Sequence, residues 1–478
     1  MKQSPDNSLL SVGIDIGTST TQVIFSRLQM ANTASYFAVP KISIVAKDVV
    51  YKGGIHETPL LDLQKIDMEA IRRIIEWEYA SAGCTPAAVG TGAVIITGES
   101  ARKENANAAV QALSGFAGDF VVATAGPDLE AVIAGKGSGA QQYSADNNCV
   151  VMNLDIGGGT TNIAVFEGER ILSKACLDIG GRLVRYDESG IVTYVSPAAA
   201  KVAQTLGLAL SVGSHANETL LSALSKKMAN LLDQLLGLAP KELLLDDLQT
   251  RGSTPFSCPK PIAALCFSGG VADAIYFMQN DYQQYKDIGV YLGASIRESS
   301  LTRAFTVIKP KETIRATVIG AGSYTTTVSG STIHYSPNLF PLKNIPVLRL
   351  SDEEERALFA GSLDLQGPFR WFLEQSGAEN IVISLKGKTD VRYDELQAAA
   401  AVFARCVHAH LPTRLPALIS LERDMAKALG VVLRQAMPER PLLCVDGIYA
   451  EHNDYMDFGN PLMGGLVIPV VVKSLIFG

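Results

Sequence analysis

Gly13-Ile14-Asp15-Ile16-Gly17-Thr18-Ser19-Thr20-Thr21 and Asn153-Leu154-Asp155-Ile156-Gly157-Gly158-Gly159-Thr160-Thr161 are two versions of one sequence pattern. Each version is an apolar run that ends in an aspartate, followed by glycines and small hydroxyl residues, and then by a second apolar run. This pattern predicts a strand, a tight glycine-rich turn and a second strand, which together form a β-hairpin. Because Asp, Ile, Gly, Thr and Thr match in register, we interpret the two copies as a repeat.

The residue types in the repeated turn suit a bound phosphate chain. A carboxylate at the end of a buried strand is costly unless a cation meets it. Glycines let backbone N–H groups approach an anion closely, because no Cβ blocks the way. The two turns would therefore hold one polyphosphate from both sides, and Asp15 and Asp155 would each supply a carboxylate for its metal ion.

Composition and charge exclude several classes of protein. A chain of 478 residues predicts about three domains, and 47% hydrophobic with 19% charged residues is typical of a well-packed globular protein. The net charge of −7 and the lack of a Lys/Arg run argue against nucleic acid as a partner. Residues 1–10 lack a signal-peptide pattern, and the apolar stretch at 464–477 is too short to cross a bilayer, so we expect a cytoplasmic protein without membrane contact. Seven scattered cysteines without a C-x-x-C pair indicate reduced thiols and no zinc or iron–sulfur site.

Strands alternate with helices along most of the chain, which predicts an α/β architecture. Together with the repeat, this alternation predicts two similar lobes that face a cleft, followed by a smaller C-terminal α+β domain. We place the domains at residues 1–145, 146–334 and 335–478. The main predicted helices are 67–80, 101–113, 128–134, 217–236, 352–359 and 394–408, and the main predicted strands besides the hairpins are 37–50, 93–98, 120–124 and 381–385.

Five segments, in the same order, resemble the nucleotide-binding motifs of the actin/heat-shock chaperone/sugar kinase superfamily of ATPases. They are the first phosphate loop Asp15–Thr20, the first connecting helix Gly126–Gly135, the second phosphate loop Asp155–Thr161, the adenosine motif Ser268–Val271 and the second connection Val318–Gly322. The resemblance implies two actin-like (ribonuclease H-like) lobes around a nucleotide cleft.

The same resemblance implies ATP and Mg²⁺ as cofactors and assigns roles to individual residues. Asp15 and Asp155 would be the catalytic pair and would hold Mg²⁺ largely through its water molecules, in keeping with the reluctance of this ion to lose its hydration shell. The residues that would bind the nucleotide are Gly17, Thr18, Ser19, Thr20, Gly157, Gly158, Gly159, Thr160, Thr161, Gly269, Gly270, Val271 and Gly320.

The chain departs from the superfamily pattern just before the proline of the first connecting helix. Many of these ATPases carry there an acidic or amide residue that orients the attacking water, whereas this chain has Gly126. Asp128, Glu130 and Glu99 are the candidates to replace it. We therefore expect ATP hydrolysis to be slow or to depend on a partner, and we leave open whether the protein is best described as an enzyme.

Over nearly its full length the chain resembles the ethanolamine ammonia-lyase reactivating factors, the EutA family. The most specific blocks are Ile95–Ala101, with the sequence Ile-Ile-Thr-Gly-Glu-Ser-Ala, and Val470–Leu475, and further ones lie at Leu10–Arg27, Asp119–Ala123 and Gly180–Leu183. The resemblance implies a chaperone-like protein that uses ATP and Mg²⁺ to release damaged cobalamin from inactivated ethanolamine ammonia-lyase, so that intact adenosylcobalamin can enter. It also implies the lyase as protein partner and a link to ethanolamine catabolism and the bacterial microcompartment.

Two other functions remain open at this point. A small-molecule kinase of the sugar kinase type begins in a similar way to Ile14–Thr18, although the second loop is closer to that of chaperones and no substrate-activating base is evident. An actin-like filament or scaffold ATPase is the other alternative, and sedimentation with and without ATP would identify it. The sequence leaves the oligomeric state open, a homo-oligomer included.

Overall fold

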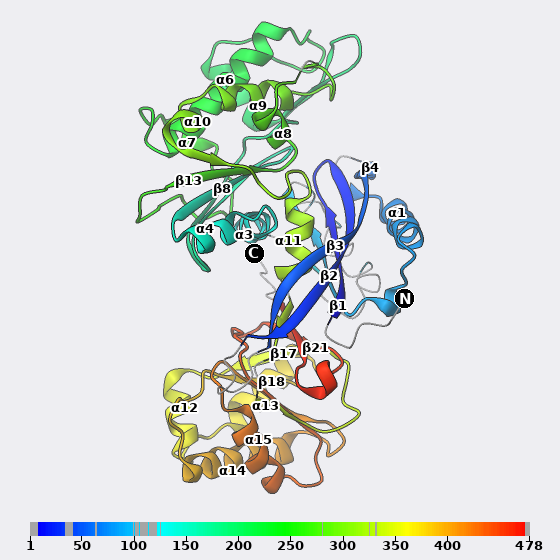
Figure 1. Ribbon diagram of the computed structural model, residues 1–478, viewed down its shortest axis with the longest axis vertical. Coiled ribbons are helices and arrows are strands. Elements are labelled where there is room, and N and C mark those ends of the chain that lie inside the picture. The colour runs from blue at the N-terminus through cyan, green and yellow to red at the C-terminus, as the bar shows by residue number, and fades with distance from the viewer. Residues whose placement is uncertain are drawn as a thin grey trace.

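In the computed structural model, the first two thirds of the chain contain two five-stranded sheets with the same topology (Figure 1). Their strand orders are β3-β2-β1-β6-β7 and β10-β9-β8-β13-β14. In each sheet the predicted hairpin is antiparallel, and the next two strands run parallel to its first strand. The predicted α/β fold with two similar lobes is therefore confirmed. The strands are β1 (Ser8–Ile16), β2 (Thr20–Asn32), β3 (Ile42–Glu57), β6 (Thr91–Ile96), β7 (Val122–Thr124), β8 (Val150–Ile156), β9 (Thr161–Glu167), β10 (Arg170–Leu177), β13 (Ala264–Ser268) and β14 (Thr306–Ile308).

The structure describes residues 8–33, 42–62, 65–98, 100, 105, 113, 122–124, 126–279, 281–324, 326–329 and 332–473. Most of the helix predicted at 101–113, the candidate Glu99, the beginning of the strand predicted at 120–124 and the end of the Val470–Leu475 block lie outside these residues.

The helices and short strands of the first two units cover the faces of these sheets. Asp67 caps the first helix by accepting the Ala70 N–H at 3.0 Å, and Asn217 caps the longest one in the same way at 2.8 Å from the Leu220 N–H. The elements are α1 (Met68–Ser81), the 3₁₀ turn Pro86–Ala88, α3 (Pro127–Gly137), α4 (Ala140–Asn147), α5 (Pro197–Thr205), α6 (Glu218–Leu235), α7 (Leu243–Asp247), α8 (Ala272–Tyr276), α9 (Gly289–Arg297), α10 (Ser300–Ala304) and α11 (Ala316–Tyr324), with the short strands β4 (Leu60–Asp62), β5 (Lys65–Ile66), β11 (Val184–Tyr186) and β12 (Val192–Val195).

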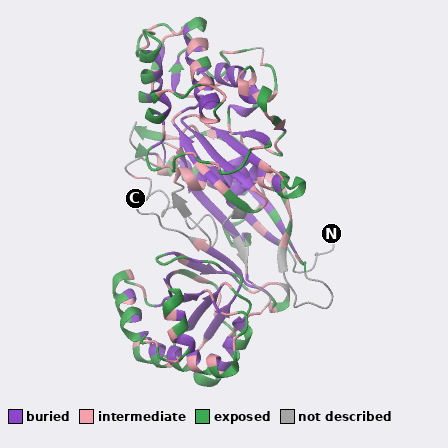
Figure 2. Ribbon diagram, turned by 90° about the vertical axis from the view of Figure 1, so that its left-hand side faces the viewer, coloured by how far each residue is buried: buried purple, intermediate pink, exposed green. Residues whose placement is uncertain are grey.

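Each sheet is buried on its central strands, as Figure 2 shows by the concentration of buried residues there. The core of the second unit joins the strands to a leucine-rich face of α6, the helix predicted at 217–236. The residues of α6 in this core are Leu220, Leu221, Leu224, Met228, Ala229, Leu231 and Leu232.

The helices α3 and α11 each pack on the sheet of the other unit. Helix α3 precedes the second hairpin in the chain and packs on β8, β9 and β10, whereas α11 follows the second sheet and packs on β1, β2 and β6. The two helices also contact each other, so they form the junction of the two units. The domain limits at 145/146 and 334/335 stay a prediction. Helix α3 lies before the first limit in the chain, but it packs on the sheet of the second unit.

The third unit is built around an eight-stranded sheet of order β15-β22-β21-β17-β18-β19-β20-β16. Its centre, β17 to β20, is parallel and alternates with helices, while antiparallel strands continue the sheet at both ends. The sequence predicted mixed α and β elements here but not the parallel centre. The strands are β15 (Thr326–Val328), β16 (His334–Tyr335), β17 (Leu342–Arg349), β18 (Val382–Leu385), β19 (Ala417–Leu421), β20 (Leu442–Val445), β21 (Tyr455–Phe458) and β22 (Pro469–Lys473), and the helices are α12 (Asp352–Phe359), α13 (Gln366–Ser376), α14 (Tyr393–His410), α15 (Ala426–Ala436) and the 3₁₀ turn Met463–Gly465.

Strand β22 and the turn before it tie the third unit to the first sheet. Val471 packs in a buried cluster with residues of β6, α3 and α11, and Val467 packs with Leu9 and Leu28 of the first sheet. The C-terminal segment therefore completes the core of the N-terminal unit. Among the residues that the structure describes, no helix has the length and apolarity that a membrane span requires.

Candidate functional site

A cavity of about 480 Å³ lies between the first two sheets and is lined by both repeated loops. Thirteen of the fifteen residues predicted for the site line it, and they come from both lobes: Asp15, Gly17, Thr18, Ser19, Thr20, Asp155, Gly157, Gly158, Gly159, Thr160, Gly269, Gly270 and Val271. The repeat thus brings together, across 140 residues of sequence, the groups that the phosphate-clamp hypothesis requires.

Two predicted residues, Thr161 and Gly320, lie outside the lining of this cavity, and their contact with a ligand stays a prediction. The Thr161 hydroxyl is buried and donates to the Ile179 carbonyl oxygen at 2.7 Å, since it is the first residue of β9 and points into the core. Gly320 lies on α11, where a Cβ would stand 2.0 Å from the Ile133 carbonyl oxygen of α3. Its role is close helix packing.

The two loops have the same internal geometry. In the first, the Gly17 N–H donates to the Thr20 carbonyl oxygen at 2.9 Å, and in the second the Gly157 N–H donates to the Thr160 carbonyl oxygen at the same distance. The loops also face each other closely, because a Cβ on Gly158 would lie 2.6 Å from the Ser19 Oγ. A side chain at 158 would therefore require the Ser19 side chain to move.

The two aspartates are buried and are held in place by hydroxyl groups. Asp15 accepts from the Thr97 Oγ1 at 2.9 Å, and Asp155 accepts from the Ser268 Oγ at 2.6 Å and from the Thr317 Oγ1 at 3.3 Å. Burial raises the pKa of Asp15 to about 7 and that of Asp155 to about 6, against the action of these hydroxyl donors. The sequence assigned no role in the site to Thr97 or Thr317, since neither belongs to a loop of the repeat.

Glu130 of α3 is a third buried carboxylate on the same cavity. It accepts the Gly98 N–H at 3.1 Å, and burial together with the charges of Asp15 and Asp155 raises its pKa to about 8. Of the two candidates to replace the residue at 126 that the structure describes, Asp128 and Glu130, Glu130 lines the cavity. Asp128 instead accepts from the Thr254 Oγ1 at 2.6 Å, outside the cavity lining.

The charge of the cavity favours a divalent cation. The residues that line it include six carboxylates, namely Asp15, Glu57, Glu130, Asp155, Asp273 and Asp287, and one cation, Arg182. A polyphosphate alone would be repelled by this excess of negative charge, whereas a nucleotide that carries a divalent cation would be attracted.

The residues present fit a magnesium ion that keeps most of its water. In the described part of the chain no group of three His, Cys, Asp or Glu side chains is placed to enclose a metal. Mg²⁺ commonly binds through one or two carboxylates, water molecules and substrate phosphates. Asp15 and Asp155, one on each side of the cavity, would supply the carboxylates, and this ligand set stays a prediction.

Arg182 connects the two lobes at this cavity. Its backbone N–H donates to the Gly158 carbonyl oxygen at 2.7 Å, and its Nε lies 3.4 Å from the Asp287 Oδ2. Its Nη2 also lies 3.8 Å from the Glu57 Oε1, which belongs to β3 of the first sheet. The guanidinium therefore lies beside the second phosphate loop and within reach of an anion in the cavity.

The turn Gly269 to Val271, which is predicted to pack against adenosine, lines one side of the cavity. Gly269 has φ +87°, and a Cβ there would lie 2.4 Å from the Ile156 carbonyl oxygen, so a side chain is excluded. A Cβ on Gly181 would lie 2.8 Å from the Val271 side chain. Gly181, which belongs to the block Gly180–Leu183 noted in the sequence, lines the same cavity.

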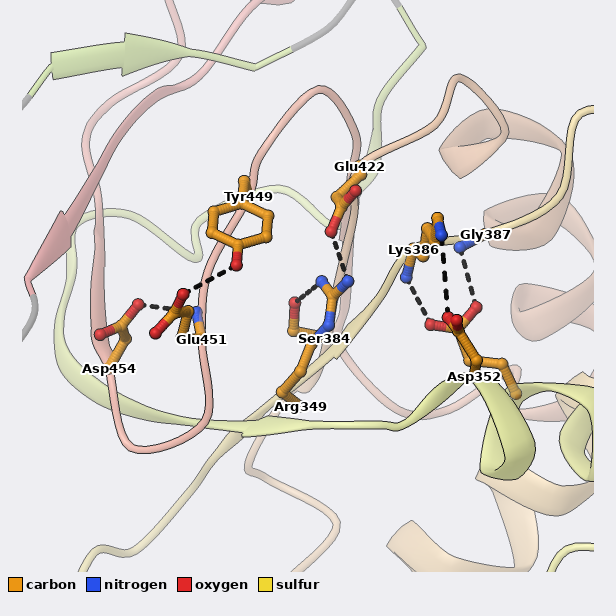
Figure 3. A network of polar contacts seen from close by, with 10 residues as sticks. Arg349, Asp352, Ser384, Lys386, Gly387, Glu422, Tyr449, Glu451 and Asp454 are labelled. Atoms are coloured by element: carbon orange, nitrogen blue, oxygen red, sulfur yellow. Dashed lines mark hydrogen bonds and ion pairs between the residues drawn. The ribbon is translucent and has the colours of Figure 1, made fainter. Parts of the chain in front are cut away.

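A second cavity, of about 550 Å³, opens in the third unit between α12 and α14. Glu355 there accepts the N–H groups of Lys386 and Gly387 at 2.5 and 3.0 Å, and Lys388 pairs with Glu395 at 2.5 Å. Figure 3 shows the Lys386–Gly387 turn and, beside it, the contacts of Arg349 with Ser384 and Glu422. Because its charged groups are largely paired with one another, this cavity makes a weaker candidate than the interlobe cleft.

Comparison with known proteins identifies the family to which the chain belongs. The family model described as "Ethanolamine utilisation protein EutA" matches residues 7–478. Curated relatives named ethanolamine ammonia-lyase reactivase EutA, from Salmonella typhimurium and Escherichia coli, are each 38% identical over 476 residues, which cover 98% of this chain and 98% of each relative. Among solved structures, a PPX-GPPA enzyme of Aquifex aeolicus is 12% identical, with a TM-score of 0.40 over 66% of this chain and 99% of that one.

Proposed function

Because the chain belongs to the EutA family of ethanolamine utilisation proteins, we propose that it is a reactivase of ethanolamine ammonia-lyase that binds ATP and Mg²⁺ in the interlobe cleft. One observation carries the nucleotide part of this proposal. Two loops of matching sequence and geometry, each with a buried aspartate beside it, face the same cavity from opposite lobes.

Each group of the cleft has a chemical task in this proposal. The backbone N–H groups and hydroxyls of Thr18, Ser19 and Thr160 would hold the β- and γ-phosphates, and Gly269 to Val271 would pack against the adenosine. Asp15 and Asp155 would orient the hydrated metal. Mg²⁺, when bound, supplies the positive charge that neutralises the phosphates.

The junction of α3 and α11 links the cleft to the relative position of the lobes. Thr317 of α11 donates to Asp155, and Glu130 of α3 lines the cavity, so both helices touch the groups that would sense the phosphates. A change in the phosphates held by the two loops would alter the angle between the lobes, a hinge motion that would act on the bound lyase.

We expect the full chain to restore the activity of cobalamin-inactivated ethanolamine ammonia-lyase only when ATP and Mg²⁺ are both present. Without the lyase, ATP hydrolysis should be slow, because Gly126 cannot orient water. The assay adds intact adenosylcobalamin and follows lyase activity with ATP and Mg²⁺, with ATP and a chelator, and with ADP and Mg²⁺. Equal recovery in all three mixtures, or basal hydrolysis as fast as that of a metabolic kinase, would contradict the proposal.

The kinase and filament hypotheses receive no support from the family, whose curated members are named as reactivases. Homo-oligomerisation and association with a microcompartment stay predictions.

The third unit is the region that we propose contacts the lyase, because its elements lie outside the lining of the cleft. The chain holds two tryptophans, and both are exposed to the same degree: Trp371 on α13 of the third unit at 56%, and Trp77 on α1 of the first unit at 57%. Exposed aromatic residues are frequent anchors of protein interfaces.

We expect Trp371→Ala to reduce reactivation about tenfold while leaving ATP binding unchanged, and Trp77→Ala to leave both unchanged. The reason is that truncation of one interface anchor costs more than about 1 kcal/mol of binding. Reactivation rates and calorimetric ATP affinity measured on the full-length variants provide the test. Deletion of the third unit would be a poorer experiment, because Val467 and Val471 complete the core of the first unit. Normal reactivation by the Trp371 variant would remove α13 from the interface.

A further inference from the structure

Arg182 lies where the second phosphate loop meets the first. Its backbone N–H donates to the Gly158 carbonyl oxygen at 2.7 Å, which fixes the residue beside the second loop. A Cβ on Gly158 would lie 3.6 Å from the Arg182 Cδ and 2.6 Å from the Ser19 Oγ of the first loop. The Arg182 side chain therefore crosses the second loop at the place where Ser19 approaches from the other lobe.

Two carboxylates contact the guanidinium, and they come from different lobes. Asp287 of the second lobe is buried, accepts the Gly289 N–H at 2.8 Å and lies 3.4 Å from the Arg182 Nε. Glu57 of the first lobe has a side chain that is 88% exposed, and it lies 3.8 Å from the Arg182 Nη2. Exposed ion pairs contribute little to stability, so the contact with Glu57 is the weaker of the two.

Glu57 is fixed beside the first phosphate loop. It is the strand partner of Thr20, the last residue of that loop. The next residue, Thr58, donates its N–H and its hydroxyl to carbonyl oxygens of the same loop at 3.1 and 2.9 Å. The ion pair of Arg182 with Glu57 therefore connects the two phosphate loops across the cavity that both residues line.

We propose that Arg182 binds the phosphate chain of the nucleotide through two parallel N–H groups and loses its ion pair with Glu57 when it does so. A phosphate accepts two charge-assisted hydrogen bonds from a guanidinium, and these are stronger than an exposed contact with a carboxylate. The phosphates also repel Glu57, which lines the same cavity. Nucleotide binding thus breaks a link between the lobes. This inference rests on the proposed ATP-binding function and names a residue through which the phosphates act on the lobes.

A double-mutant cycle of Arg182→Gln and Glu57→Gln in the full-length protein tests this exchange, with the affinity for ATP and Mg²⁺ measured by calorimetry. Glutamine at position 182 removes the charge but keeps an N–H donor for Asp287. We expect Arg182→Gln to weaken binding by about 10- to 100-fold, the scale of a hydrogen bond to a charged group. Glu57→Gln should strengthen binding by about two- to fivefold, because ATP no longer has to break the ion pair. Combined with Arg182→Gln, it should have no further effect, since residues in contact are coupled.

Three further variants separate the exchange from the general charge of the cavity. Asp273→Asn removes another carboxylate of the lining, and it should change the affinity by the same factor with and without the Arg182 substitution. Arg185→Gln removes a neighbouring cation that lies outside the lining, 5.1 Å from the centre of the Tyr194 ring, and the affinity should stay within about twofold of the wild type. Arg182→Lys keeps the charge but not the planar fork, and it should weaken binding by about threefold or more.

The outcomes distinguish this inference from the function on which it rests. If the wild type binds ATP and Arg182→Gln binds it equally well, the assignment of Arg182 is overturned while the proposed function stands. If Arg182→Gln does not fold, Arg182→Lys decides by the same criterion. If Glu57→Gln strengthens binding by the same factor in both backgrounds, its effect is one of general charge and the exchange is overturned. If the wild type does not bind ATP, both proposals fail.

Discussion

Replacement of Asp15 or Asp155 by asparagine is expected to weaken Mg²⁺-dependent ATP binding by about 10- to 100-fold, the scale found when groups of a metal site are altered. Each carboxylate is buried on one side of a cavity whose lining carries an excess of negative charge. The amide that replaces it keeps the shape of the side chain but loses the charge that attracts the metal. Isothermal titration calorimetry with ATP, in the presence of Mg²⁺ and of a chelator, measures the effect.

The same substitutions are expected to stabilise the nucleotide-free protein by roughly 1–3 kcal/mol near pH 7.5. Burial raises the pKa values of Asp15 and Asp155 from 3.8 to about 7 and about 6, so the folded protein binds more protons than the unfolded chain between these values. The loss of folding stability that these raised pKa values cause is absent below about pH 4 and grows as the pH rises. It is complete above the pKa that each aspartate has in the folded protein. Stability of the wild type should therefore fall from pH 4 to pH 8, since Glu130, with a pKa of about 8, adds to the same trend.

Thermal unfolding at several pH values, with and without Mg²⁺, tests whether the Asn substitutions stabilise the free protein while they weaken its binding of the metal. The Asn variants should show a smaller fall with pH than the wild type, and Mg²⁺ should stabilise them less. Asp128→Asn, which alters an acid outside the cavity lining, serves as the control. Unchanged ATP affinity in both Asn variants would refute the assignment of the cleft.

Substitution of Gly137 or Gly320 by alanine is expected to lower the free energy of unfolding by about 3 kcal/mol or more, or to prevent folding. A Cβ on Gly137 would lie 1.8 Å from the Ala316 carbonyl oxygen, and a Cβ on Gly320 would lie 2.0 Å from the Ile133 carbonyl oxygen. Both obstacles are backbone atoms of the opposite helix, so α3 and α11 would have to separate. Since each helix packs on a different sheet, their separation would also displace the two lobes.

Gly367→Ala is the matched control, because Gly367 also lies in a helix, α13, and a Cβ there would meet nothing within 4 Å. Alanine should be neutral or stabilising at that position by up to about 1 kcal/mol. Urea denaturation of the three variants gives the comparison. A midpoint for Gly137→Ala equal to that of the wild type would mean that the two helices do not approach so closely.

Local sequence was sufficient for the hairpins and for the chemistry of their turns. The strand-turn-strand pattern around Asp15 and Asp155 depends on neighbours in the chain, and the match between the copies predicted two similar units. The caps at Asp67 and Asn217 and the leucine face of α6 are local in the same sense, since both follow from spacing along one helix.

Tertiary packing decided which of the candidate acids faces the cleft. Asp128 and Glu130 are both acidic residues in the first turn of α3, and the sequence could not rank them. Residues two apart on a helix point in different directions, and the sheet on which the helix packs determines which of them is turned toward the cavity. The same reason explains Thr161 and Gly320, whose motifs predicted ligand contact but whose side chain or Cα faces a neighbouring element.

The sequence by itself therefore determined the two loops, the α/β class and the family resemblance, because each of these is written in short stretches of neighbouring residues. Only the tertiary structure showed that α3 and α11 exchange lobes, that Val471 completes the core of the N-terminal unit, and that Glu130 joins the two aspartates at the cleft. These features depend on contacts between segments up to several hundred residues apart. Such contacts depend on the complementary packing of whole helix and sheet surfaces, which short stretches of sequence do not specify.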